Sequence, residues 1–114
     1  MEDRFLQQLK KGVLEMLVLQ AICKKPSYGY ELIMELKHRS GELFALKEGT
    51  LYPILYRLED SGMIVSSWSQ GAGKTAPKKI YSPTEKGWQE SARRLEGWRE
   101  FSGSVDAIIR EDEQ

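Results

Sequence analysis

The sequence has few of the residues that build covalent or metal-dependent chemistry. Its single cysteine, Cys23, excludes an internal disulfide and a zinc site of four cysteines. His38 is the single histidine and lies at a polar helix end, so no pairing of a serine or cysteine nucleophile with a histidine base is expected. Cys23 closes an apolar segment and is predicted to be a small buried side chain. We therefore expect a protein that is not an enzyme and that uses no cofactor or metal.

Long apolar runs are also missing. No run reaches the roughly 18 residues of a membrane span, and no basic start precedes an apolar signal core. These features favour a soluble cytoplasmic protein with no membrane partner. Forty percent of the 114 residues are hydrophobic, which allows only a small core and favours added stability from a partner subunit.

There is no excess of charge of one sign, because 17 basic residues balance 17 acidic ones. A basic excess would have indicated nucleic-acid binding. The balance is uneven along the chain: residues 1–84 have a net charge of +3 and residues 85–114 a net charge of −3. Residues 63–83 contain Lys74, Lys78 and Lys79 and no acid. Two interpretations stay open, an acidic end that maintains solubility or one that points away from a polyanion.

Apolar periodicity and capping residues predict four helices. The first covers residues 9–22, with Gly12 separating off a preceding turn or arm. The second is capped by Ser27 and ends near Arg39, and a short apolar link or brief strand over residues 43–46 follows it. The third covers residues 51–60, with Thr50 as N-cap and Pro53 in its first turn.

The third predicted helix has two contrasting faces. At about 100° per residue, one face holds the apolar residues Leu51, Ile54, Leu55 and Leu58. The opposite face holds Tyr52, Pro53, Tyr56 and Arg57. Two tyrosines and an arginine are unusual on a face meant only for water, which indicates a binding surface.

Two predicted strands, residues 63–69 and 78–82, form a β-hairpin with a long basic tip between them. The tip contains Gly71-Ala72-Gly73-Lys74-Thr75, which has the composition of a phosphate-binding loop. Such a loop needs a glycine where Trp68 stands and a following helix where Pro77 stands. We therefore interpret the segment as a flexible, lysine-bearing tip.

A final helix is predicted from Pro83-Thr84 to about Arg110. Apolar and small residues recur in it at alternating spacings of three and four, at Trp88, Ser91, Leu95, Trp98, Ser102, Val105 and Ile109. Such a seam is typical of a helix that packs against a partner helix. The predicted organisation is a body over residues 1–83 and a dimerisation helix with an acidic tail over residues 84–114.

This order of elements predicts a mainly α fold with a small β-hairpin, namely a winged helix-turn-helix followed by a long C-terminal dimerisation helix. In that fold the third helix enters the DNA major groove, and the hairpin, or wing, contacts a neighbouring groove or the backbone. The alternative is a winged helix that binds proteins and not DNA.

Three segments then resemble a known family. They are Ser27–Leu32, Lys47–Glu59 with its Gly-Thr-Leu-Tyr-Pro run, and Lys79–Gly87. In order and spacing they are similar to the signature segments of the PadR family of bacterial transcriptional regulators, over nearly the whole chain. The resemblance implies a homodimeric repressor of the short subfamily with a single C-terminal helix, bound to a near-palindromic operator in double-stranded DNA.

Site residues follow from the predicted fold and the resemblance together. The expected DNA contacts are Tyr28, Tyr30, Lys47, Thr50, Tyr52, Pro53, Tyr56, Arg57, Lys74, Lys78 and Lys79. For Tyr28 and Tyr30, phosphate contact and packing both stay open. The expected dimer contacts are Leu9, Val13, Trp88, Leu95, Trp98, Val105 and Ile109.

The resemblance also implies a place for an effector. In a multidrug-sensing member of the short subfamily, paired tryptophans at the position of Trp98 line a central pore that holds flat aromatic compounds. A small aromatic or hydrophobic effector would accordingly contact Met16, Leu95 and Trp98. Arg94 and Ser91 depart from the smaller or more apolar pore residues of that relative, so an open pore and a closed dimer core are both considered.

Overall fold

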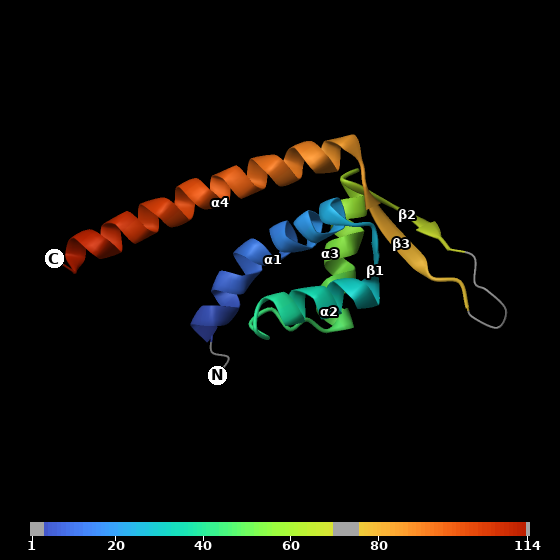
Figure 1. The fold of residues 1–114 in the computed structure, drawn as a ribbon, viewed down its shortest axis with the longest axis horizontal. Helices are drawn as coiled ribbons and strands as arrows, with labels where there is room; N and C mark the ends of the chain where they lie inside the picture. Colours follow the sequence, from blue (N-terminus) through green and yellow to red (C-terminus); the bar gives the residue numbers. More distant parts are fainter. Residues whose placement is uncertain (1–3, 70–75, 114) are drawn as a thin grey trace.

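The computed structural model describes residues 4–69 and 76–113. Four helices and three strands occur in these ranges, in the order α1 (Arg4–Lys24), β1 (Ser27–Tyr28), α2 (Gly29–Arg39), α3 (Glu48–Asp60), β2 (Ile64–Trp68), β3 (Lys79–Pro83) and α4 (Glu85–Asp112) (Figure 1). The predicted fold class, mainly helical with a small hairpin and a long last helix, is confirmed.

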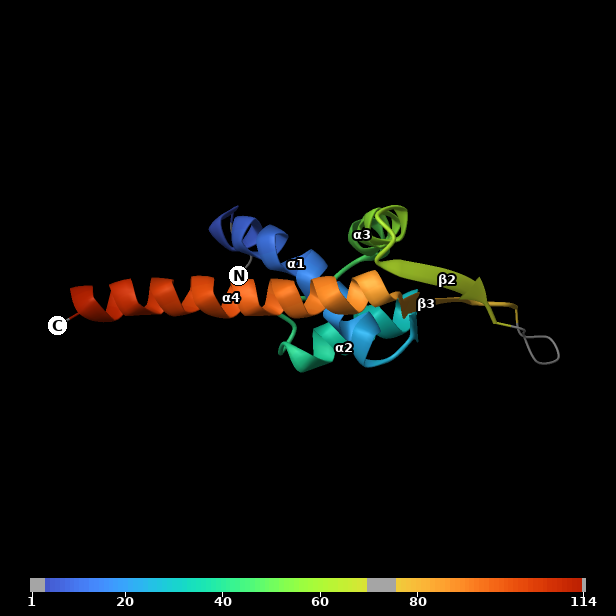
Figure 2. The same ribbon diagram turned by 90° about the horizontal axis from the view of Figure 1, so that it is seen from above.

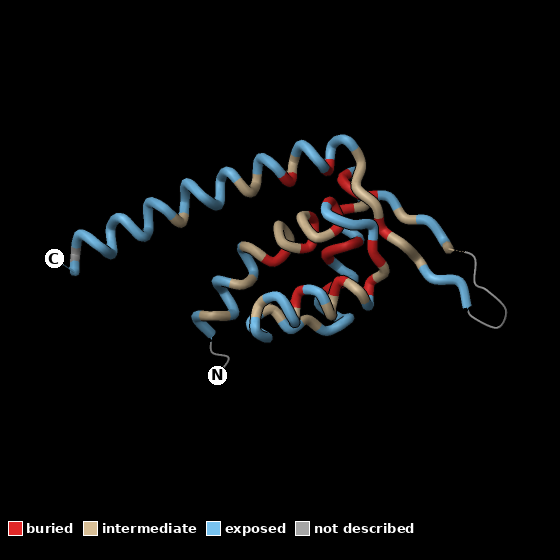
Figure 3. Tube along the Cα trace, in the orientation of Figure 1, coloured by how far each residue is buried: buried red, intermediate tan, exposed pale blue. Residues whose placement is uncertain are grey.

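The core lies where α1, α2, α3 and the root of the sheet meet (Figure 3). The apolar stripe predicted for the third helix is buried there, with Leu51, Ile54, Leu55 and Leu58 each at most 4% exposed. The helix α1 contributes Val18, Leu19 and Ile22, which are fully buried. Burial of this stripe fixes which face of α3 remains available to solvent.

The strands form one antiparallel sheet in the order β1-β3-β2. The two-residue β1 corrects the cap predicted for the second helix. Ser27 is not the cap of α2, since it pairs with Tyr81 in the sheet and its hydroxyl donates to the Lys25 carbonyl at 2.7 Å. Residues 43–46 form the predicted link and not the brief strand that was its alternative, and Phe44 N–H donates to the Ser40 hydroxyl at 2.9 Å in a turn.

Two helix starts also differ from the prediction. The helix α1 runs through Gly12 without a break from Arg4, because the roughly 1 kcal/mol cost of a mid-helix glycine is small beside the burial of its apolar face. The helix α3 begins at Glu48, with Lys47 and not Thr50 as N-cap. The Lys47 carbonyl already accepts the N–H groups of Thr50 and Leu51, so Pro53 lies beyond the first turn.

The helix α4 begins as predicted, with the Thr84 hydroxyl accepting the Gly87 N–H at 3.0 Å. It runs beside α1 and then continues past the core, so that the molecule measures 64 × 33 × 20 Å (Figures 1 and 2). Its seam carries exposed apolar side chains, including Trp98, Phe101, Val105, Ile108 and Ile109. No helix among the described residues is long and apolar enough to span a membrane.

Candidate nucleic-acid interface

The solvent-facing side of α3 presents the aromatic pair predicted from the sequence. Tyr52 is 45% exposed and Tyr56 is 71% exposed, although four neighbours on the opposite side of the helix are buried. Pro53 and Thr50 are exposed on the same element. A short helix anchored by its apolar stripe thus holds two phenol groups outward in a fixed orientation.

Tyr52 is positioned by contact with the start of α2. A side-chain carbon at Gly29 would lie 2.6 Å from the Tyr52 hydroxyl, so the glycine leaves the space that this phenol occupies. Tyr52 also lies near the buried Tyr81 of β3. The pKa of Tyr81 is raised, first by burial and then by the charged forms of Tyr52 and Glu59. Tyr52 therefore packs α3 against the start of α2.

Arg57 is held on the opposite edge of the exposed face. Its Nε donates to a carboxylate oxygen of Glu15 in α1 at 3.2 Å, and the pair is partly exposed. At about 100° per residue, Tyr52 and Arg57 diverge by roughly 140° around the helix. Sequence spacing gives no signal for this ion pair, because its partners are 42 residues apart. Arg57 must leave or share Glu15 to contact another anion.

The start of α2 lies next to this face. Tyr28 N–H donates to the Glu31 carboxylate at 2.9 Å, and the Tyr28 side chain is half-buried. Tyr30 is 70% exposed on the first turn of α2, and Lys47 is exposed at the N-cap of α3. The Tyr28 side chain is therefore partly covered, whereas Tyr30 and Lys47 are open to solvent.

The wing lysines lie over tyrosine rings. Lys78 Nζ is 5.6 Å from the centre of the Tyr28 ring, and Lys79 Nζ is 5.8 Å from the centre of the Tyr81 ring. Cation–π attraction of this kind restrains a charged side chain without neutralising it. The third predicted phosphate contact, Lys74, lies outside the described residues.

The wing is also tied directly to α3. The Ser66 hydroxyl of β2 donates to the Glu59 carboxylate of α3 at 2.6 Å. Past that point, Ser69 N–H donates to the Lys78 carbonyl at 2.8 Å and continues the pairing of the two strands. These contacts fix the hairpin relative to the exposed face of α3.

The predicted effector contacts fall into two separate grooves. A groove of about 940 Å³ between α1 and α4 is lined by Met16, Phe44, Trp98 and Phe101, with Arg94 at its edge. The Trp98 and Phe101 rings lie 6.4 Å apart. Leu95 instead lines a smaller groove of about 420 Å³ with Trp88 and Cys23. Within one protomer, Met16 and Trp98 line the larger groove and Leu95 lines the smaller one.

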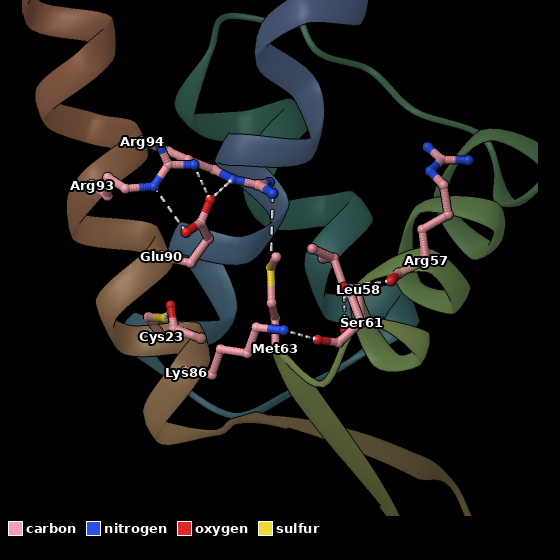
Figure 4. Close-up of polar contacts among 10 residues, drawn as sticks. Cys23, Arg57, Leu58, Ser61, Met63, Lys86, Glu90, Arg93 and Arg94 are labelled. Carbon is pink, nitrogen blue, oxygen red and sulfur yellow. Dashed lines mark hydrogen bonds and ion pairs between the residues drawn. The ribbon is translucent and has the colours of Figure 1, made fainter.

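An ion-pair cluster that the sequence reasoning missed joins α4 to the root of the wing (Figure 4). Glu90 accepts hydrogen bonds from Arg93 and from Arg94, the latter at 3.0 Å. These bonds, Arg93 first and Arg94 second, lower the pKa of Glu90 to about 2. Arg94 also reaches the Met63 sulfur at 3.8 Å. The i, i+3 and i, i+4 spacing of these three charged residues on one helix is the sequence signal from which the ion pairs could have been predicted.

Cys23 is buried as predicted, and its thiol lies 3.8 Å from the Gly87 carbonyl. Burial raises its pKa, which is lowered in part by a hydrogen bond with Ser91. In the part of the chain that the structure describes, no three His, Cys, Asp or Glu residues cluster in a way that would hold a metal ion.

Three features together define a winged helix-turn-helix protein. They are the helix α3 with one buried apolar face, the hairpin that is hydrogen-bonded to it, and the last helix, which projects from the body. Residues 18–93 match the model of the transcriptional regulator PadR-like family, which is more than half of the chain. The chain belongs to this family, whose members are transcriptional regulators and not enzymes.

Solved structures agree with this assignment. The chain is similar to a PadR family transcriptional regulator from Eggerthella lenta, with 30% identity, coverage of 92% of this chain and 88% of that one, and a TM-score of 0.80. It is similar to a PadR-like regulator from Bacillus cereus, with 30% identity, coverage of 90% and 96%, and a TM-score of 0.77. It is also similar to Bacillus subtilis PadR in complex with operator DNA, with 30% identity, coverage of 73% and 46%, and a TM-score of 0.65.

Proposed function

We propose that this protein is a cytoplasmic, homodimeric repressor that binds double-stranded DNA through α3 and the wing. One observation carries the proposal: Tyr52 and Tyr56 face solvent on a helix whose opposite side is completely buried. The Bacillus subtilis relative, whose structure was solved with operator DNA, supports DNA as the partner. In this account Tyr52, Tyr56 and Arg57 contact the major groove, while Lys47, Lys78 and Lys79 contact phosphates.

Charge distribution is consistent with this role. The net charge of +3 on residues 1–84 lies in the part of the chain that holds α3 and the wing, whereas residues 85–114, with a net charge of −3, belong mostly to α4. DNA responds to the local potential and not to the sum over the molecule. A total charge of zero is therefore compatible with a DNA-binding surface.

Dimerisation would occur through α1 and α4. Apolar side chains on both helices are exposed in a single chain, among them Leu9, Trp98, Val105 and Ile109. Packing α4 against a second copy would cover this surface and place two copies of α3 about 34 Å apart, one turn of the double helix. A near-palindromic operator with half-sites at that spacing follows.

An aromatic or hydrophobic effector would occupy the groove beside Trp98 and Phe101. Binding there would favour a dimer geometry that spans the half-sites poorly, and so release the DNA. Titration with a panel of flat aromatic compounds, followed by tryptophan emission, tests this part. Quenching by at least one compound is expected, and no response to any of them would favour a closed dimer core.

A titration of labelled duplex tests DNA binding itself. The probe is the region upstream of this protein's own coding sequence, compared with random duplex of equal length. The proposal expects tight binding to the first and weak, strongly salt-dependent binding to the second. A winged helix that binds only proteins would bind neither duplex in a salt-dependent way, and that result would contradict the proposal.

A further inference from the structure

Trp68 is a solvent-facing aromatic residue at the end of β2. It is 68% exposed, whereas Ile64, at the start of the same strand, is 1% exposed. A large exposed aromatic on a short edge strand is a solubility liability unless a partner covers it. Its exposure therefore calls for a partner.

The strand pairing shows which side of the hairpin Trp68 occupies. Residues two apart lie on the same face of a strand, so Trp68 shares a face with Ser66, which is hydrogen-bonded to Glu59 of α3 at 2.6 Å. Trp68 is thus one repeat, about 7 Å, beyond the contact between wing and α3. Val65 lies on the opposite face and is 53% exposed.

The surroundings of Trp68 are cationic. Lys79 is its direct cross-strand partner in β3, and Lys78 precedes that residue. No Asp or Glu occurs between Met63 and Pro83. The Ser69–Lys78 hydrogen bonds continue the pairing beyond Trp68, so its backbone is held in place as the hairpin projects from the body (Figure 1).

We propose that Trp68 contacts DNA, an inference that rests on the function proposed above. Its indole packs on the sugar-phosphate backbone at the edge of a minor groove. This minor groove is next to the major groove that α3 enters. The exposed tyrosines of α3, the indole of Trp68 and its cross-strand partner Lys79 suit a polyanion with apolar deoxyribose edges. The contact carries no base specificity, so it raises affinity for every duplex alike.

The test compares Trp68→Ala, Trp68→Phe and the opposite-face control Val65→Ala with the wild type. Binding to the upstream duplex and to random duplex is measured by fluorescence anisotropy. Trp68→Ala is expected to weaken both by the same factor, about tenfold, as for truncation of a well-packed interface aromatic. Trp68→Phe should lose about threefold, because it retains part of the packing surface, and Val65→Ala less than twofold.

Tryptophan emission gives a second readout. The difference between wild-type and Trp68→Phe emission isolates the signal of Trp68, which is expected to be quenched when duplex is added. Wild-type affinity in Trp68→Ala with an unchanged difference signal, or a loss confined to one duplex, would overturn the inference. Failure of the wild type to bind either duplex would count against the proposed function itself.

Discussion

Single residues decide how α4 is attached to the body. At Gly87, a side-chain carbon would overlap the Met63 carbonyl oxygen and lie 3.0 Å from its carbonyl carbon. These are backbone atoms at the root of β2, where the Thr84 N–H also donates to the Met63 carbonyl. A side chain at residue 87 would therefore force the backbone of one of these two segments to shift.

Gly87→Ala is therefore expected to destabilise the fold by about 1–3 kcal/mol, as overpacking of a filled site does. Thermal denaturation measures the loss. Gly103→Ala in the same helix is the control, because a side-chain carbon there meets nothing within 4 Å. That variant should be neutral or gain up to about 1 kcal/mol from helix propensity. Equal melting temperatures for the two variants would refute the packing argument.

Glu90 gives stability a defined pH dependence. Arg93 and then Arg94 lower its pKa to about 2, from an ordinary value of 4.5. A carboxylate with a lowered pKa in the folded state stabilises the fold above the unfolded-state pKa, and this contribution is lost as pH falls from 4.5 towards 2. The wild type should melt above Glu90→Gln at pH 7, and the difference should shrink below pH 4.5. A constant difference from pH 7 to pH 2.5 would contradict this assignment.

At the scale of elements, the dimer contact proposed for α4 can be tested through its exposed seam. Its seam residues Val105 and Ile109 are exposed in one chain, and a charge at either would be buried in a dimer without compensation. Val105→Asp combined with Ile109→Asp is expected to give a monomer in light scattering coupled to size exclusion. Ala107→Asp, placed about 160–200° around the helix from that seam, should remain dimeric. Dimers from both variants would exclude this seam as the interface.

Sequence periodicity was sufficient to predict the elements whose buried residues recur at a regular local spacing. The stripe from Leu51 to Leu58 and the start of the last helix at Pro83-Thr84 are local patterns, and the structure confirms both. The two-residue β1 has no local signal, because it exists only through pairing with Tyr81 and Ile80 far along the chain.

The same limit applies to the candidate site. The exposure of Tyr52 and Tyr56 follows from the helix repeat, whereas the ion pair between Arg57 and Glu15 depends on how α1 and α3 pack. The start of α3 was predicted three residues too late, because backbone hydrogen bonds and not the capping side chain determine where it begins. The Lys47 carbonyl accepts the first N–H groups of α3, so a better capping side chain at Thr50 had no effect on where that helix begins.

At the scale of the whole molecule, the hairpin and the C-terminal end of α4 lie at opposite ends of the 64 Å axis (Figure 1). Positive charge at the wing should therefore act on DNA with little compensation from the acidic residues of α4. Interactions over distances above the Debye length, about 8 Å at physiological salt, are largely screened.

The salt dependence of DNA binding tests whether the wing lysines act independently of the acidic residues of α4. Lys78→Gln should weaken binding to all duplexes and reduce the slope of log affinity against log salt by about one. Lys11→Gln, on the half of α1 away from the wing, should leave the slope unchanged (Figure 1). An equal change in slope for both variants would mean that binding responds to net charge and not to the wing lysines.

The central claim is that the exposed face of α3 binds a duplex, and the most direct measurement is operator affinity of Tyr52→Ala combined with Tyr56→Ala. Circular dichroism and mass in solution are the controls: Tyr56 is 71% exposed, and Tyr52 is 45% exposed and packs at the start of α2, so the double variant should retain the fold and the mass of the wild type with a modest loss of stability. Each tyrosine is expected to stabilise the complex by about 1–3 kcal/mol, so affinity of the double variant for the upstream duplex should fall at least about thirtyfold. Affinity within about threefold of the wild type, in a folded dimer, would contradict the account.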